Sequence, residues 1–151
     1  MKDTPQSLLE DVKNNIILLY DVEQDYIVSL LKYSENIIYK VEFKSSQPVV
    51  FRIHRPGYHN IEELEGEIRW MYELHKSTDV ELPVVYRGRD GGFLQKMHTS
   101  SGEDVYCSVI SFLNGSPLGE LEGESLLKGM QELGRITAKL HIQSISRDKT
   151  I

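Results

Sequence analysis

The sequence has 151 residues, of which 40% are hydrophobic and 26% are charged, a composition typical of a folded globular domain. Its formal net charge of -6 disfavours general nucleic-acid binding, because the chain provides no overall positive field for phosphate backbones. There is one cysteine, no apolar run of the ~20 residues that span a membrane, and no signal-peptide pattern. We therefore expect a cytoplasmic protein without a membrane partner.

The N-terminal part predicts a helix followed by a β-hairpin. Thr4 and Pro5 form a typical helix start, and apolar residues recur at helical spacing as far as Tyr20. The period changes to two across residues 26–43, where the polar residues 33–36 separate two alternating runs. This alternation predicts two antiparallel strands joined at that polar segment.

The middle of the chain predicts a third strand, a long helix and two short strands. Residues 48–54 are rich in β-branched and aromatic side chains, which favour a strand. Asn60 can cap the next segment, in which apolar residues form one helical stripe over residues 61–75. Short strands are predicted at residues 82–88 and 93–97.

The last part predicts one strand at residues 105–113 and one helix at residues 126–140. The order of elements predicts an α+β fold, with an antiparallel five-stranded sheet, one long packed helix, and a further helix at each end. The apolar stripe of the last predicted helix consists of Leu126, Met130, Leu133 and Leu140. No later segment is long enough to cover this stripe, so we expect the natural protein to be longer and this chain to fold back or self-associate through the last helix.

Arg52 and Glu67 are the pair with the clearest chemical meaning. Arg52 shares a strand face with Val50 and His54, and Glu67 lies at the edge of the buried stripe of the long helix. A cation and a carboxylate can therefore meet between sheet and helix. Kinases use such a pair because the basic residue has to be held against nucleotide phosphates. The spacing alone is equally compatible with an ordinary, partly buried ion pair.

The sequence resembles the aminoglycoside phosphotransferase family, small-molecule kinases with a protein-kinase-like fold that include choline kinases. The resemblance implies an N-terminal helix in residues 1–24, a nucleotide-binding N-lobe in residues 25–113, and a hinge with the first helix of a C-lobe in residues 114–151. The stretches that carry the resemblance have the order and spacing of the family's amino-terminal lobe, and they are residues 34–41, 49–56, 67–71, 82–85, 110–115 and 133–141.

The resemblance also implies roles for individual residues. Arg52 would contact the α and β phosphates of ATP or GTP with a fork of donors, and Glu67 would orient it. The hairpin loop lacks the pattern G-x-G-x-x-G, so side-chain donors would have to contribute there. The remaining implied contacts lie in this loop over the triphosphate and in the hinge strand at the adenine, and they are Ser34, Glu35, Asn36, Ser111 and Leu113.

The catalytic parts of the family are absent from this chain. No H-x-D-x-x-x-x-N string occurs between Leu118 and Ile151, so the resemblance places the catalytic base and the ligands of Mg²⁺ in a lobe that the chain lacks. The acceptor would be a small alcohol or amine. We expect this chain alone to transfer no phosphate. Two alternatives stay open: a stand-alone or relic kinase-like module that acts by protein-protein contact, and an unrelated binder of small ligands.

Overall fold

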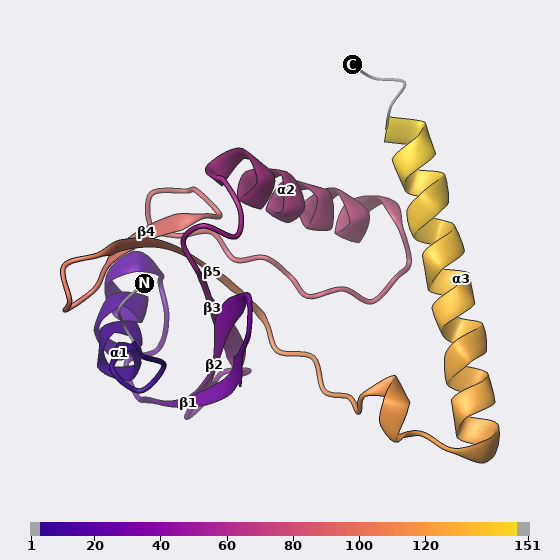
Figure 1. Cartoon of the computed structure of the whole chain (residues 1–151), viewed down its shortest axis with the longest axis horizontal. Helices are drawn as coiled ribbons and strands as arrows, with labels where there is room; N and C mark the ends of the chain where they lie inside the picture. Colours follow the sequence, from indigo (N-terminus) through magenta and orange to yellow (C-terminus); the bar gives the residue numbers. More distant parts are fainter. Residues whose placement is uncertain (1–3, 148–151) are drawn as a thin grey trace. The chain divides into compact units, whose positions relative to one another are not determined.

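The computed structural model describes residues 4–147 (Figure 1). The elements in chain order are α1 (Leu8–Leu19), β1 (Tyr26–Tyr33), β2 (Asn36–Phe43), β3 (Val49–His54), α2 (Ile61–Ser77), β4 (Gln95–His98), β5 (Asp104–Ser111), the 3-10 helix η1 (Leu118–Glu120) and α3 (Gly123–Arg147).

The chain forms two compact units. The first runs from the N-terminal helix to Trp70 and from Pro83 to Phe112, and the second contains Met71–Leu82 and the chain from Leu113 onward. The domain boundaries implied by the resemblance stay predictions.

The sheet of the first unit has the strand order β1-β2-β3-β5-β4, and every neighbouring pair is antiparallel. The α+β prediction with five antiparallel strands is therefore confirmed. Tyr39 on β2 is paired with Phe51 on β3, which is paired with Val109 on β5, so these three side chains share one face of the sheet. All three are buried.

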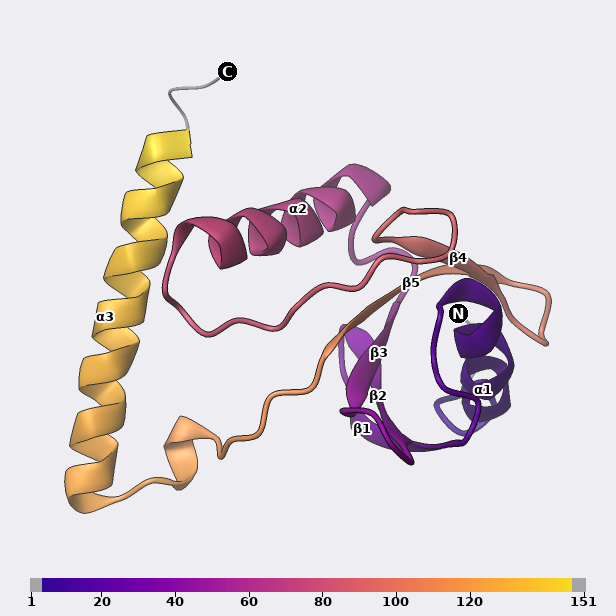
Figure 2. The ribbon, with the colours of Figure 1, turned by 180° about the vertical axis from the view of Figure 1, so that it is seen from behind.

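Helix α1 covers this buried face, and the sheet curves around it in both views of the ribbon (Figures 1 and 2). Ile16 and Tyr20 are buried, and the rings of Tyr20 and Phe51 meet edge to face with 6.3 Å between centroids. The Tyr39 hydroxyl donates to the Pro5 carbonyl over 2.6 Å. The N-terminal helix and the sheet therefore share one hydrophobic core.

The start of α2 matches its prediction. The Asn60 side chain accepts a hydrogen bond from the Glu63 backbone N–H over 2.9 Å, and the Glu63 carboxylate accepts one from the Asn60 N–H over 3.1 Å. This reciprocal arrangement is a capping box, which satisfies two N–H groups that the helix itself leaves without partners. The prediction that Asn60 caps the long helix is confirmed.

The prediction of a strand at residues 82–88 is wrong. The segment makes one isolated bridge, between Val85 and Ile110. Pro83 has no N–H to donate to a ladder, and at Gly88 the chain enters a turn in which the Gly88 N–H donates to the Gly92 carbonyl over 2.8 Å. Pairing with β5 is limited to the two backbone hydrogen bonds that flank the bridge, from the Tyr86 N–H to the Val109 carbonyl over 3.0 Å and from the Ser111 N–H to the Val84 carbonyl over 2.8 Å.

Two other boundaries differ from the sequence prediction. The first helix begins at Leu8 and not at Pro5, because the helical bonding from the Leu8 N–H to the Thr4 carbonyl over 3.1 Å is not continued: the Leu9 N–H donates to the Gln6 carbonyl over 3.4 Å. The last strand ends at Ser111, two residues before the predicted end.

The second unit contains the long helix α3. Its residues Met130 and Leu133 are 53% and 48% exposed, and Leu126 and Leu140 are half-buried. These four residues, which we call the α3 stripe, are therefore incompletely covered. The carboxylate of Asp79 pairs with Lys139 in the same unit. Within residues 4–147, no helix has the length and apolar character needed to cross a membrane.

Candidate nucleotide-binding site

The predicted contact between Arg52 and Glu67 exists. Arg52 Nη1 donates to Glu67 Oε1 over 2.9 Å, which joins the middle of β3 to α2. The Arg52 side chain is 12% exposed, whereas that of Glu67 is 42% exposed. The guanidinium is therefore the more desolvated partner, and the carboxylate both balances its charge and fixes its direction.

Arg52 lies on the face of the sheet opposite the α1 core. Alternation along β3 places the buried Phe51 and Ile53 on the core face and Arg52 on the other. Across the ladder, Arg52 is paired with Ile38 on one side and Ser108 on the other. The site face thus combines one held cation with half-buried apolar side chains, a suitable surface for a nucleotide with a flat base and charged phosphates.

His54 lies beside Arg52 on the same face and is buried. Its Nε2 is 3.0 Å from the Ser108 hydroxyl, and its Nδ1 has no hydrogen-bond partner within residues 4–147. Burial, and to a smaller extent the nearby positive charge of Arg52, lower the pKa of His54 to about 4. His54 is therefore neutral at pH 7, so the positive charge at this position comes from Arg52.

The predicted triphosphate loop is the tight turn between β1 and β2. The Ser34 N–H donates to the Asn36 carbonyl over 2.9 Å and closes the turn. The backbone N–H of Glu35 and the Ser34 hydroxyl hold the pKa of the Glu35 carboxyl below its usual value. A carboxylate cannot donate to a phosphate, so Glu35 can contribute there only through its backbone N–H.

A further residue at this turn was missed by sequence reasoning. Arg55 Nη1 donates to the Ser34 carbonyl over 2.7 Å, and the Arg55 guanidinium lies over the rings of Tyr33 and Tyr58. The signal in the sequence was an arginine directly after a predicted strand, close to two tyrosines that border predicted turns. It pointed to no contact with the turn, because Tyr33 and Ser34 lie more than twenty residues before Arg55 in the sequence and only Tyr58 is a near neighbour.

The predicted hinge begins at the end of β5. The Ser111 N–H donates to the Val84 carbonyl over 2.8 Å, and the Ser111 hydroxyl accepts from the Val84 N–H over 2.9 Å. This N–H of Ser111 is thus already bound within the first unit. Next to it, the ammonium of Lys40 lies 4.7 Å from the ring centroid of Phe112. Leu113 belongs to the second unit, and its contact with adenine stays a prediction.

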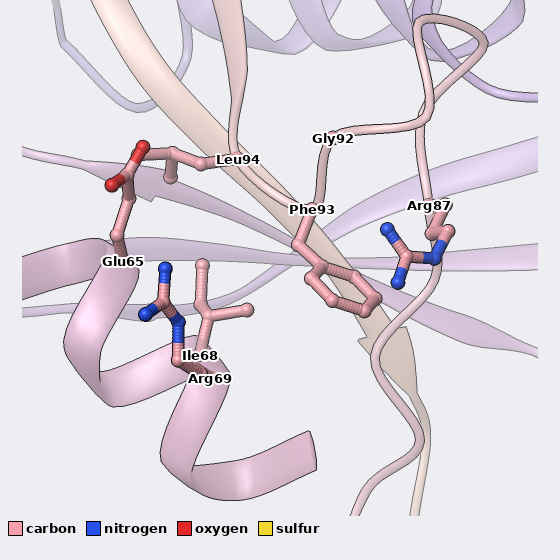
Figure 3. Close-up of a pocket in the computed structure, with 7 residues that line it drawn as sticks. All are labelled: Glu65, Ile68, Arg69, Arg87, Gly92, Phe93 and Leu94. Atoms are coloured by element: carbon pink, nitrogen blue, oxygen red, sulfur yellow. The ribbon is translucent and has the colours of Figure 1, made fainter. Parts of the chain in front are cut away.

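A separate cavity of about 300 Å³ lies between α2 and the segment that leads into β4 (Figure 3). The guanidinium of Arg87 lies 4.0 Å from the ring centroid of Phe93 at its wall. None of the predicted nucleotide contacts lines this cavity, so it does not belong to the candidate site. The lining consists of Glu65, Ile68, Arg69, Arg87, Gly92, Phe93 and Leu94.

The residues present do not fit a magnesium site. In the part of the chain that the structure describes, no three side chains of histidine, cysteine, aspartate or glutamate come together in a way that could hold a metal ion.

A five-stranded antiparallel sheet whose third strand carries a cation bound to a carboxylate of the following helix defines the amino-terminal lobe of a protein-kinase-like fold. The chain belongs to the phosphotransferase enzyme family, APH, because the model of this family matches residues 31–148. The predicted family is thereby confirmed. No curated protein matches the chain significantly.

Two solved structures are similar to this chain. The microcompartment-associated aminopropanol kinase has a TM-score of 0.68 and 30% sequence identity, over 86% of this chain and 39% of its own. Amicoumacin kinase hAmiN, in complex with AMP-PNP, Ca²⁺ and Ami, has a TM-score of 0.55 and 19% identity, over 70% of this chain and 31% of its own, and this likeness concerns the fold alone. The chain therefore spans less than half the length of either protein.

Proposed function

We propose that this chain is the nucleotide-binding N-lobe of an ATP-dependent small-molecule phosphotransferase. The observation that carries the proposal is the 2.9 Å contact between Arg52 and Glu67, on the sheet face opposite the hydrophobic core. An ion pair whose cation is more buried than its carboxylate, beside a half-buried apolar surface, is suited to receive the phosphates of a nucleotide.

In this proposal Arg52 binds the α and β phosphates and Glu67 keeps its guanidinium in place. The planar guanidinium can donate to Glu67 and to a phosphate at the same time, because it carries five N–H donors in a fixed fork. The turn at Ser34, Glu35 and Asn36 covers the triphosphate, and the segment from Ser111 to Leu113 meets the base. ATP and GTP both suit these contacts.

The rest of the activity is proposed for a C-lobe outside this chain. The structurally similar aminopropanol kinase and amicoumacin kinase act on small molecules by their names, and the latter was solved with AMP-PNP. We propose a small alcohol or amine as the acceptor, a C-lobe that supplies the catalytic base and the ligands of Mg²⁺, and a cytoplasmic location, where ATP is available. This chain alone would then be inactive in phosphate transfer.

A second candidate function is supported by the exposure of Met130 and Leu133 on α3. Apolar side chains this exposed are typical of a surface that binds another protein segment. A stand-alone module that acts by protein-protein contact or self-association through the α3 stripe would use them. The coding sequence after Ile151 separates the two candidates: a frame that continues into H-x-D-x-x-x-x-N supports the enzyme, and an immediate natural stop codon supports the module.

Nucleotide binding can be tested by an NMR titration of the isotope-labelled chain with MgATP. We expect shifts of the amide signals of Arg52 and of the turn at residues 34–36, and a loss of affinity of at least about tenfold in Arg52→Ala. Arg89→Ala is the matched control, because Arg89 is an exposed arginine whose nearest ionic partner is Asp21, 3.4 Å away. Unchanged signals of Arg52 and the turn at saturating MgATP would refute the proposal.

A further inference from the structure

We propose that Arg55 is a positioning residue that holds the β1–β2 turn in place over the nucleotide phosphates. This inference rests on the proposed function, because the position of the turn matters to a nucleotide only if the triphosphate lies against it. Arg55 directly follows the last residue of β3, and the resemblance to known kinases gave it no role.

Arg55 donates a hydrogen bond to the backbone of the turn. Its Nη1 donates to the Ser34 carbonyl over 2.7 Å. Asn36 and His54 are the last paired residues at this end of the β2–β3 ladder, so Arg55 is the first residue beyond it. Its side chain therefore links β3 to the turn at a point beyond the last paired residues of β2 and β3. A hydrogen bond from a charged donor is stronger than the neutral bonds of the ladder.

Two aromatic rings hold the guanidinium in position. Its central carbon lies 4.8 Å from the ring centroid of Tyr33 and 5.0 Å from that of Tyr58. Both distances are within the ~6 Å over which a cation is attracted to an aromatic face. Nη1 is also 3.4 Å from the Tyr58 hydroxyl. A guanidinium can stack between two rings and donate in its own plane, and an ammonium cannot do both.

The same connection also positions the Arg52–Glu67 pair. Tyr58 stands shortly before Asn60, whose side chain caps α2, and α2 carries Glu67. The residues that fix the turn and the residues that fix the Arg52 guanidinium are therefore joined through one short connection between β3 and α2. This connection therefore sets the distance between the two groups that would contact the triphosphate.

The chemical benefit is preorganisation of backbone donors. The turn lacks the glycine-rich pattern of many phosphate-binding loops, and Glu35 adds a negative charge to it. Its N–H groups can meet a phosphate only if the turn is held in one conformation. Loss of Arg55 should therefore weaken binding of a triphosphate and leave binding of adenosine, which has no phosphate, unchanged.

The test compares Arg55→Gln with the control Arg89→Gln, which changes an exposed arginine away from the turn. Hydrogen exchange of the amides in residues 33–36 and the affinities for MgATP and adenosine are measured for both variants and the unchanged chain. In Arg55→Gln we expect faster exchange in the turn, an about tenfold weaker affinity for MgATP and the same affinity for adenosine. In Arg89→Gln we expect no change in any of the three.

Three results would overturn the inference. Unchanged exchange in Arg55→Gln would show that Arg55 does not hold the turn. Faster exchange with an unchanged MgATP affinity would show that the turn does not act on the nucleotide, and an equal loss for adenosine would show a general structural defect. If Arg55→Gln does not fold, Tyr58→Leu removes one ring and its hydroxyl but keeps the hydrogen bond from Arg55 to the Ser34 carbonyl, and the same criteria apply to it. A chain that binds no MgATP refutes the proposed function instead, and the exchange measurement still decides whether Arg55 holds the turn.

Discussion

The replacement Glu67→Gln tests the central contact of the candidate site. It removes the negative charge and keeps the size of the side chain, so Arg52 stays largely buried without a charged partner. An exposed ion pair contributes ~0–1 kcal/mol to stability, and a hydrogen bond to a charged group about 1.5–3 kcal/mol. Since Glu67 is 42% exposed and screened by water, we expect a loss near the lower of these ranges, about 1 kcal/mol in the free energy of unfolding. For a chain of 151 residues this is about 2–4 °C in Tm.

The effect on nucleotide binding should be larger than the effect on stability. Without the carboxylate, the Arg52 guanidinium can turn away from the phosphates, and loss of one charge-assisted hydrogen bond weakens binding about tenfold or more. Calorimetric titration with MgATP measures this loss, and denaturant unfolding measures the stability. The single variant Arg52→Gln and the double variant Arg52→Gln, Glu67→Gln complete a mutant cycle, in which we expect a coupling of about 0.5 kcal/mol or more.

Glu65→Gln is the matched control for this prediction. Glu65 lies on the same helix as Glu67 and makes no ion pair within residues 4–147. We expect it to change neither stability nor affinity by more than about 0.5 kcal/mol. If Glu67→Gln binds MgATP as tightly as Glu65→Gln does, Glu67 does not orient Arg52 for a nucleotide.

Three further changes test other parts of the structure. Because burial lowers the pKa of His54 to about 4, the unfolded chain takes up a proton below about pH 6.5 that the folded chain does not. The contribution of neutral His54 to the free energy of unfolding is present in full above about pH 6.5 and falls by up to about 1.4 kcal/mol per pH unit toward pH 4. His54→Gln should remove this part of the pH dependence measured by denaturant unfolding. An identical pH dependence in both chains would contradict the prediction. Gly88→Ala should destabilise by about 1–3 kcal/mol in thermal unfolding, because a Cβ there would fall inside the buried side chain of Gln95, whereas Gly66→Ala on α2 meets nothing and should be neutral or stabilising. If the α3 stripe mediates self-association, sedimentation should show dimers or larger species that Met130→Ser reduces, and a monomer at high concentration would argue against this role.

The parts of the fold that the sequence predicted best are those in which one period runs over many residues. The alternation over residues 26–43 and the apolar stripe over residues 61–75 identified β1, β2 and α2, because burying one face of such an element requires that pattern. The segment 82–88 looked like a strand by composition. Its pairing depends on whether a partner ladder reaches it, and local composition does not contain that information.

The candidate site likewise contains one contact that the sequence predicted and one that it did not. The Arg52–Glu67 contact was predictable because strand alternation and helix spacing each place one residue at the boundary between sheet and helix. Arg55 was not predictable, since its position depends on rings at residues 33 and 58 that only the folded chain brings together. The role proposed for Arg55 therefore cannot be predicted from a local sequence pattern around residue 33 or around residue 58.

The packing of α1 limits how far the chain can be shortened at its N-terminal end. Leu8, Val12 and Ile16 are fully buried against the sheet, and the Asp11 carboxylate accepts hydrogen bonds from the N–H and the hydroxyl of Ser100, at the far end of the β4–β5 hairpin. A fragment that begins at residue 25 would expose the apolar face of the sheet to water, and the β4–β5 hairpin would lose its hydrogen bonds to Asp11. Such a fragment should precipitate during purification, although every residue proposed to touch a nucleotide would still be in it.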